Sequence, residues 1–257
     1  MTPVALTIAS VDSSSGAGVT RDLSVFGDLG VYGMSCTCNV TSQNSCGVHR
    51  IFRVAPAIIA DQIDCALKDV TPGAVKIGMF YSLRAGAIIE QRIKKYGLRN
   101  IVLDTPRISK NTTPIITERA FKFLRARLLP LADVITPNAE ETEALTGMHI
   151  TDLSGSREAC RVLCDMGAKN VIVKGGHLDT PTDILYDGRD YYEVPGEPCG
   201  RRVHGTGCTF SAALCAGLAL GKSMPDAFAD AKSYVNEQII RSKRFGKTDI
   251  YYFVQGE

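Results

Sequence analysis

Short apolar runs typical of buried β-strands alternate with amphipathic, helix-like segments along almost the whole chain. Strands are expected at residues 4–8, 35–41, 74–79, 100–104, 133–136 and 170–174. Helices are expected at residues 22–29, 56–67, 83–96, 118–129, 138–145 and 156–166. Such alternation is typical of an α/β fold, because each helix returns the chain to begin a neighbouring parallel strand. We therefore predict a doubly wound, mostly parallel sheet flanked by helices.

The last third of the chain departs from this alternation. Two strand-like runs at residues 183–187 and 191–194 flank Gly188-Arg189-Asp190, which predicts a small hairpin at the edge of the sheet. Two further helices are expected, one at residues 211–220 and one after Pro225. A hairpin at an exposed edge offers a surface on which two copies of the chain could form a homodimer.

Size and composition limit the classes of protein to consider. A chain of 257 residues is expected to form a single domain over residues 1–257, because α/β folds of this length are commonly one unit. The net charge of +2 gives no reason to expect a nucleic-acid partner. No apolar stretch reaches the roughly 20 residues that span a bilayer, so no membrane segment is expected. Nine cysteines without a framework spacing or a secretory leader predict reduced thiols and a cytoplasmic location.

The segment at residues 204–213, His-Gly-Thr-Gly-Cys-Thr-Phe-Ser-Ala-Ala, predicts a glycine-rich turn that leads into a helix of small residues. Backbone amides at a helix start have no partner within the helix, so the turn is a candidate anion site. Cys208 stands at that positive end, which is expected to favour its thiolate form. The segment alone is equally compatible with a turn that packs a small, buried cysteine against a helix.

Polar residues follow the predicted strands at the points where they end. They are Asp12, Gln43 with Asn44, Asp104, Asn138 and Lys174. Ligands of open α/β sheets bind beyond the carboxyl ends of the strands, so we expect these residues to share one cleft. Each of them alone is compatible with a structural role, and Asn138 is an ordinary candidate for a helix N-cap.

Three familiar motifs are missing from the sequence. It contains no Gly-x-x-x-x-Gly-Lys-Ser/Thr phosphate loop and no Gly-x-Ser-x-Gly nucleophile elbow. Gly16-Ala17-Gly18 lacks the third glycine of the dinucleotide fingerprint. These absences disfavour a P-loop enzyme, an esterase and an NAD-binding protein.

Seven segments match one known family in order and in spacing. They are residues 5–22, 30–44, Lys76-Ile77-Gly78-Met79, Val102-Leu103-Asp104, Ile135-Thr136-Pro137-Asn138, Val173-Lys174-Gly175-Gly176-His177 and 204–213. Together they resemble the hydroxymethylpyrimidine and phosphomethylpyrimidine kinases of thiamine biosynthesis, which have the ribokinase-like fold. The resemblance covers nearly the whole chain. It implies ATP- and Mg²⁺-dependent phosphorylation of a hydroxymethyl group on a small heteroaromatic ring.

The resemblance also implies roles for residues on the phosphate side of the cleft. The backbone amides of Gly205, Thr206 and Gly207 would hold the phosphoryl group in transit, and Cys208 would accept the substrate's hydroxyl proton. The resemblance further assigns Asp104, Asn138 and Lys174 to nucleotide binding and Glu141 to magnesium, which it would bind through waters.

On the substrate side, the same matching assigns four residues. Asp22 would receive the hydroxymethyl group, Gln43 would read the polar edge of the pyrimidine, and Met79 would pack on the ring. Ser10 would approach the substrate from the first loop, where the family usually has glycine.

Several substrate-side residues differ from the family pattern. Ser15 also replaces a glycine, Thr20-Arg21 replaces Gln-Ala, and Pro106-Arg107 follows Asp104. Two alternatives therefore stay open: a pyridoxine or pyridoxal kinase of the same fold, and a non-catalytic ligand-binding homologue. The retained phosphate-side residues favour an enzyme over a pure binder.

Overall fold

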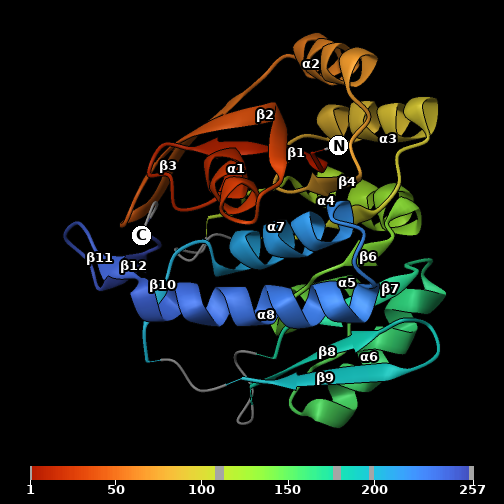
Figure 1. Cartoon of the computed structure of the whole chain (residues 1–257), viewed down its shortest axis with the longest axis vertical. Coiled ribbons are helices and arrows are strands. Elements are labelled where there is room, and N and C mark those ends of the chain that lie inside the picture. Colours follow the sequence, from red (N-terminus) through yellow and green to blue (C-terminus); the bar gives the residue numbers. More distant parts are fainter. Residues whose placement is uncertain (1, 108–112, 176–180, 197–199, 255–257) are drawn as a thin grey trace.

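The computed structural model describes residues 2–107, 113–175, 181–196 and 200–254. Within these residues, nine strands form one sheet in the order β3-β2-β1-β4-β5-β6-β7-β8-β9 (Figure 1). The pairs from β2 to β7 are parallel, and β3, β8 and β9 are antiparallel additions. The strands are β1 (Val4–Asp12), β2 (Tyr32–Asn44), β3 (Gly47–Arg53), β4 (Ala74–Ile77), β5 (Ile101–Leu103), β6 (Val134–Ile135), β7 (Asn170–Val173), β8 (Thr182–Tyr186) and β9 (Tyr191–Pro195). The predicted doubly wound, mostly parallel sheet is confirmed.

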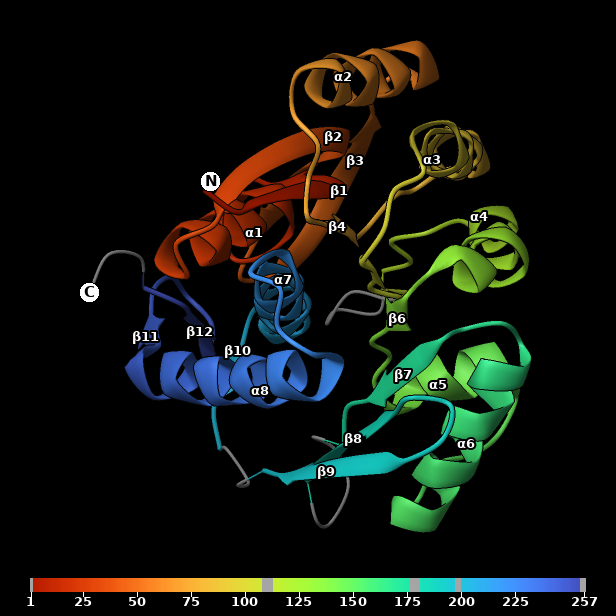
Figure 2. The same ribbon diagram turned by 45° about the vertical axis from the view of Figure 1, so that its right-hand side comes forward.

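Helices cover both faces of this sheet. They are α1 (Gly18–Asp28), α2 (Pro56–Asp69), α3 (Leu83–Tyr96), α4 (Glu118–Phe123), α5 (Ala139–Thr146), α6 (Leu153–Asp165), α7 (Thr206–Ala219) and α8 (Met224–Arg241). Figure 2 shows α7 between α8 and the sheet, with α1 on the same side and α2 to α6 on the other. No described helix has both the length and the hydropathy needed to cross a membrane.

Alternating side chains on the central strands build two separate cores. On β5, Ile101 and Leu103 face the α2–α6 side and Val102 faces the α7 side. This follows from the two-residue period of a strand. On β4 the same period places Ala74 and Lys76 on the α7 side. A lysine therefore occupies a core-facing position in an otherwise apolar strand.

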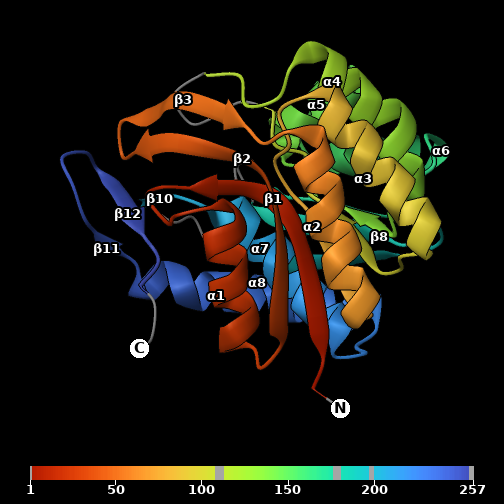
Figure 3. The ribbon, with the colours of Figure 1, turned by 90° about the horizontal axis from the view of Figure 1, so that it is seen from above.

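A second, three-stranded sheet closes the end of the molecule beside β2 and β3 (Figure 3). Its strands are β10 (Arg202–Val203), β11 (Lys243–Arg244) and β12 (Ile250–Tyr252), in the order β10-β12-β11. This sheet could not be predicted from the sequence, because strands of two or three residues are too short to show an apolar period.

The bounds of the other elements show where the local sequence pattern predicts a helix or strand correctly. The helix expected at residues 83–96 is confirmed at both ends, and the edge hairpin is confirmed with its strand bounds shifted by at most one residue. The single helix expected at residues 118–129 is wrong: after α4 the chain widens into a π-helical turn and ends in a 3₁₀ turn at Pro130. Proline has no N–H to continue an α-helix. β3 was missed because most of its residues are at least partly exposed and lack an apolar alternation.

Candidate active site

A cavity of about 240 Å³ lies at the carboxyl ends of the parallel strands, beside the start of α7. All but one of the site residues predicted from the sequence line it. They are Ser10, Gln43, Met79, Asp104, Asn138, Glu141, Lys174, Gly205, Thr206, Gly207 and Cys208. The exception is Asp22. The cleft expected at the strand ends is therefore formed, although Gly176 and His177 of the last motif lie outside the described residues.

The Gly-Thr-Gly-Cys turn (residues 205–208) forms the first turn of α7. Gly205 is the N-cap, in the left-handed region at a φ of 80°, and a Cβ there would collide with the carbonyl oxygen of Gly16. Because no side chain caps this helix start, the N–H groups of the next residues are available to an anion. The helix begins five residues earlier than the predicted Ser211, so Cys208 lies inside its first turn.

Cys208 does not have the electrostatic setting that the sequence predicts. Burial, together with the nearby carboxylates of Asp104 and Asp22, raises the pKa of its thiol to about 11. Lys76 and a hydrogen bond from the Gly18 amide lower the pKa, but less than burial raises it. Burial therefore outweighs the effect of the helix end, and the expectation of a favoured thiolate is wrong.

A charged cluster lies on the nucleotide side of the cavity. The Nζ atom of Lys174 is 3.7 Å from Oδ1 of Asp104, and it lies close above Gly207. Glu141 and Asn138 form a reciprocal capping box at the start of α5, with hydrogen bonds of 3.0 and 2.8 Å. Burial raises the pKa of Glu141 to about 7; Lys174 lowers it and Asp104 raises it. A neighbouring cation favours the charged form of such a carboxylate and so lowers its pKa.

His204 joins two predicted strand-end residues, which the sequence analysis did not foresee. Its Nε2 atom lies 2.8 Å from Oδ2 of Asp12 and 2.9 Å from Nε2 of Gln43. Gly16 packs against the imidazole so closely that a Cβ would overlap the ring. Burial raises the pKa of Asp12, but the hydrogen bond and charge of His204 outweigh it and hold the pKa below its ordinary value. In the sequence, this role of His204 was indicated by its position directly before the Gly-Thr-Gly-Cys turn.

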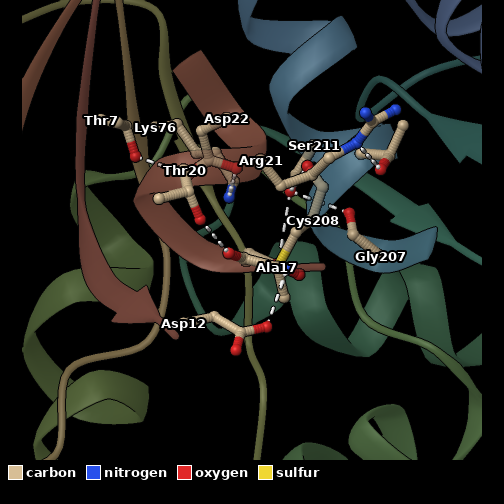
Figure 4. Close-up of polar contacts among 12 residues, drawn as sticks. Thr7, Asp12, Ala17, Thr20, Arg21, Asp22, Lys76, Gly207, Cys208 and Ser211 are labelled. Atoms are coloured by element: carbon tan, nitrogen blue, oxygen red, sulfur yellow. Dashed lines mark hydrogen bonds and ion pairs between the residues drawn. The ribbon is translucent and has the colours of Figure 1, made fainter. Parts of the chain in front are cut away.

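Ser10 and Arg21 are two positions at which the sequence differs from the family pattern, and both make specific hydrogen bonds. The Ser10 hydroxyl donates a 3.0 Å hydrogen bond to the carbonyl oxygen of Met79, so it ties the end of β1 to the segment after β4. Arg21 does not line the cavity: its guanidinium is buried beneath α7, donating to Thr209 and Gln238. Figure 4 shows Arg21 beside the Gly-Thr-Gly-Cys turn.

Asp22 lies beneath the cavity and not in its wall, so the expectation that it contacts substrate directly is wrong. Its carboxylate has no exposed surface, accepts a 2.6 Å hydrogen bond from Thr7 and pairs with Nζ of Lys76 at 2.5 Å (Figure 4). Lys76, which does line the cavity, was missed. In the sequence, Lys76 belongs to the matching motif Lys76-Ile77-Gly78-Met79, but no role was predicted for it.

The outer edge of the cavity is closed by β12. Ile250 and Tyr252 line it, and the Tyr252 ring meets the His204 ring edge-on with centroids 5.6 Å apart. Residues from both ends of the chain therefore share this wall.

Comparison with known proteins identifies relatives over nearly the whole chain. The family model for phosphomethylpyrimidine kinase matches residues 12–252. The hydroxymethylpyrimidine/phosphomethylpyrimidine kinase of Bacillus subtilis is 38% identical over 239 residues, covering 91% of this chain and 88% of that protein. The thiamine biosynthesis bifunctional protein of Geobacter sulfurreducens is 39% identical over 94% of this chain, which spans half of that protein's length.

Solved structures agree with this comparison. The phosphomethylpyrimidine kinase of Clostridium difficile is 37% identical with a TM-score of 0.84, covering 92% of this chain and 99% of that one. An ADP complex of the pyridoxal kinase of Bacillus subtilis is 31% identical with a TM-score of 0.91, covering 99% and 98%. The length of the family match and the identities around it lead to one conclusion: this chain belongs to the phosphomethylpyrimidine kinase family.

Proposed function

We propose that this protein transfers the γ-phosphoryl group of ATP to 4-amino-5-hydroxymethyl-2-methylpyrimidine and to its monophosphate. The observation that carries the proposal is the meeting of the Gly-Thr-Gly-Cys turn, Lys174 and Gln43 around one cavity. The turn and Lys174 supply positive potential for phosphate. The carboxamide of Gln43 supplies both a donor and an acceptor for the polar edge of a pyrimidine.

For the alcohol, the hydroxyl oxygen forms a bond to the γ-phosphorus while the bond to the β–γ bridging oxygen breaks. The electron pair of that bond leaves with ADP, and the hydroxyl proton passes to Cys208 in its thiolate form, which Lys76 stabilises. Amides of residues 206–208 are positioned by the helix start to stabilise the charge on the phosphoryl oxygens. Positioning and electrostatics thus provide most of the acceleration.

Magnesium fits the donor chemistry of the nucleotide side. Glu141 and Asp104 provide carboxylate oxygens there, but no group of three or more metal-binding side chains occurs within the described residues. Such a set suits an ion that keeps several waters and arrives with nucleotide phosphates. Bound there, magnesium would neutralise charge on the phosphates, while Asn138 holds Glu141 in place through the capping box.

The test is a comparison of acceptors with purified protein and Mg-ATP, following ADP release and phosphorylated product. We expect turnover of the pyrimidine alcohol and of its monophosphate, with severe loss in Cys208→Ala for the alcohol. Absence of turnover with both pyrimidines would refute the proposal.

Pyridoxal is the second candidate acceptor, favoured by the close overlay with a pyridoxal kinase at a TM-score of 0.91. It also carries a hydroxymethyl group on a six-membered nitrogen ring. A kcat/KM for pyridoxal above that for the pyrimidine alcohol would make it the preferred acceptor.

A further inference from the structure

Lys76 and Asp22 form an ion pair with no exposed surface on either side chain. The Nζ–Oδ1 distance is 2.5 Å, and Thr7 satisfies the other carboxylate oxygen. Removing two charges from water is costly, and such a pair often stabilises a protein no more than apolar residues of similar volume. Its presence on β4, in a position that the strand period assigns to the core, calls for a role beyond packing.

The pair is asymmetric with respect to the cavity. Lys76 forms part of the cavity wall and Asp22 does not. The Lys76 side chain is fully buried, so its ammonium is shielded from bulk water. Burial lowers the pKa of Lys76, but the charges of Asp22, Cys208 and Asp104 outweigh burial and raise it above its ordinary value. Its ammonium therefore stays charged at neutral pH.

The two acceptors place different demands on such a cation. The alcohol is neutral, whereas its monophosphate adds close to two negative charges beside the γ-phosphate. Lys76 and Lys174 are the lysine or arginine residues among the described cavity lining. Lys174 is already paired with Asp104 on the nucleotide side. Of the two lysines, Lys76 has the stronger electrostatic effect on the Cys208 thiol, so we assign an acceptor phosphate next to Cys208 to Lys76.

Resting on the function proposed above, we propose that Lys76 binds the phosphate of the monophosphorylated acceptor. In this step an acceptor phosphate oxygen donates its electron pair to the γ-phosphorus, and the bond to the β–γ bridging oxygen breaks with its electrons leaving on ADP. A dianionic acceptor has no proton to remove. The step thus depends on charge neutralisation by Lys76 and not on a base.

The experiment measures kcat/KM for both acceptors in wild type, Lys76→Met, Asp22→Asn and the double variant. Lys76→Met is expected to lower the ratio of monophosphate to alcohol kcat/KM about 100-fold, the range of a lost charge-assisted contact. Asp22→Asn is expected to leave that ratio unchanged or to raise it, because it removes a negative charge and keeps the ammonium. The double variant, which keeps the net charge of the pair, is expected to follow Lys76→Met and guards against misfolding caused by an unpaired Asp22.

Lys174→Met is the matched comparison, since it removes the other cavity lysine. It is expected to lower kcat/KM for both acceptors by similar factors through loss of nucleotide binding. The assignment of Lys76 is overturned if its variants lower kcat/KM for both acceptors equally. It is also overturned if Asp22→Asn shifts the ratio of monophosphate to alcohol kcat/KM in the same direction as Lys76→Met. In either case the pair is structural. Wild type that phosphorylates neither pyrimidine overturns the proposed function itself, and the inference with it.

Discussion

The Nε2 atom of His204 lies 2.8 Å from Oδ2 of Asp12, and this contact joins the end of β1 to the residue that precedes the Gly-Thr-Gly-Cys turn. Asp12 also accepts hydrogen bonds from the amides of Ser14 and Ala17. One carboxylate therefore organises the loop between β1 and α1 and anchors the turn across the cavity.

Asp12→Asn is expected to lower the free energy of unfolding by about 1–3 kcal/mol at pH 7, because a charged hydrogen-bond acceptor is lost. The folded-state pKa of Asp12 lies below its ordinary value of 3.8, so its stabilisation is present above that pH and is lost as pH falls through the folded pKa. Urea unfolding of both proteins from pH 3 to pH 7 checks this. A difference that stays constant across the range would contradict the linkage.

The pH dependence of alcohol phosphorylation reports on Cys208. Since the pKa of its thiol is raised to about 11, the thiolate fraction grows about tenfold per pH unit below that value. We therefore expect kcat/KM for the alcohol to rise about 100-fold from pH 7 to pH 9. The same profile is expected to be much flatter in Cys208→Ala. A flat wild-type profile would mean that the thiolate is not the base.

Glu141→Gln tests the proposed magnesium site. The variant is expected to raise the Mg²⁺ concentration for half-maximal activity about tenfold, because a carboxylate oxygen is lost. In wild type that concentration is expected to rise as pH falls below 7, since protonation of a group with a pKa of about 7 competes with the cation. Glu140→Gln is the control: it removes an exposed carboxylate from the same helix turn. Equal effects of both variants would assign the change to the helix dipole.

Gly205→Ala is expected to abolish activity and to destabilise the fold, because the added Cβ would meet the carbonyl oxygen of Gly16. Gly221→Ala is a matched control, since Gly221 has the same φ of 80° with no neighbouring atom within 4 Å. Gly221→Ala is expected to lower the free energy of unfolding by only about 1 kcal/mol, which is the cost of the backbone strain. Thermal unfolding and turnover of the two variants separate strain from collision. Activity retained in Gly205→Ala would show that the turn tolerates a shift.

The central sheet was predictable because its strands are short, continuous apolar runs buried on both faces. β3 was not, since its residues are mostly exposed and it is held by pairing with β2. The pairing of β10 with β12 joins residues about 50 positions apart, beyond the reach of local periodicity. Its register arises only in the folded chain.

The cavity-lining residues were found through ordered motifs, whereas the roles of Asp22, Cys208 and Lys76 required three-dimensional information. A motif gives the order of residues but not which of two partners faces the cavity, so Asp22 was assigned the contact that Lys76 can make. The thiol of Cys208 could not be assigned its protonation state from the helix end alone. Burial and the surrounding carboxylates are properties of the assembled site.

The position of β12 has a consequence for the order in which the protein becomes functional. Ile250 and Tyr252 form part of the cavity wall, yet they follow every strand of the large sheet along the chain. A nascent chain that has completed every strand of the large sheet still has an open cavity. Completion of the cavity is therefore coupled to synthesis of β12, and proteolytic loss of this strand would open the cavity while leaving the large sheet and its helices intact.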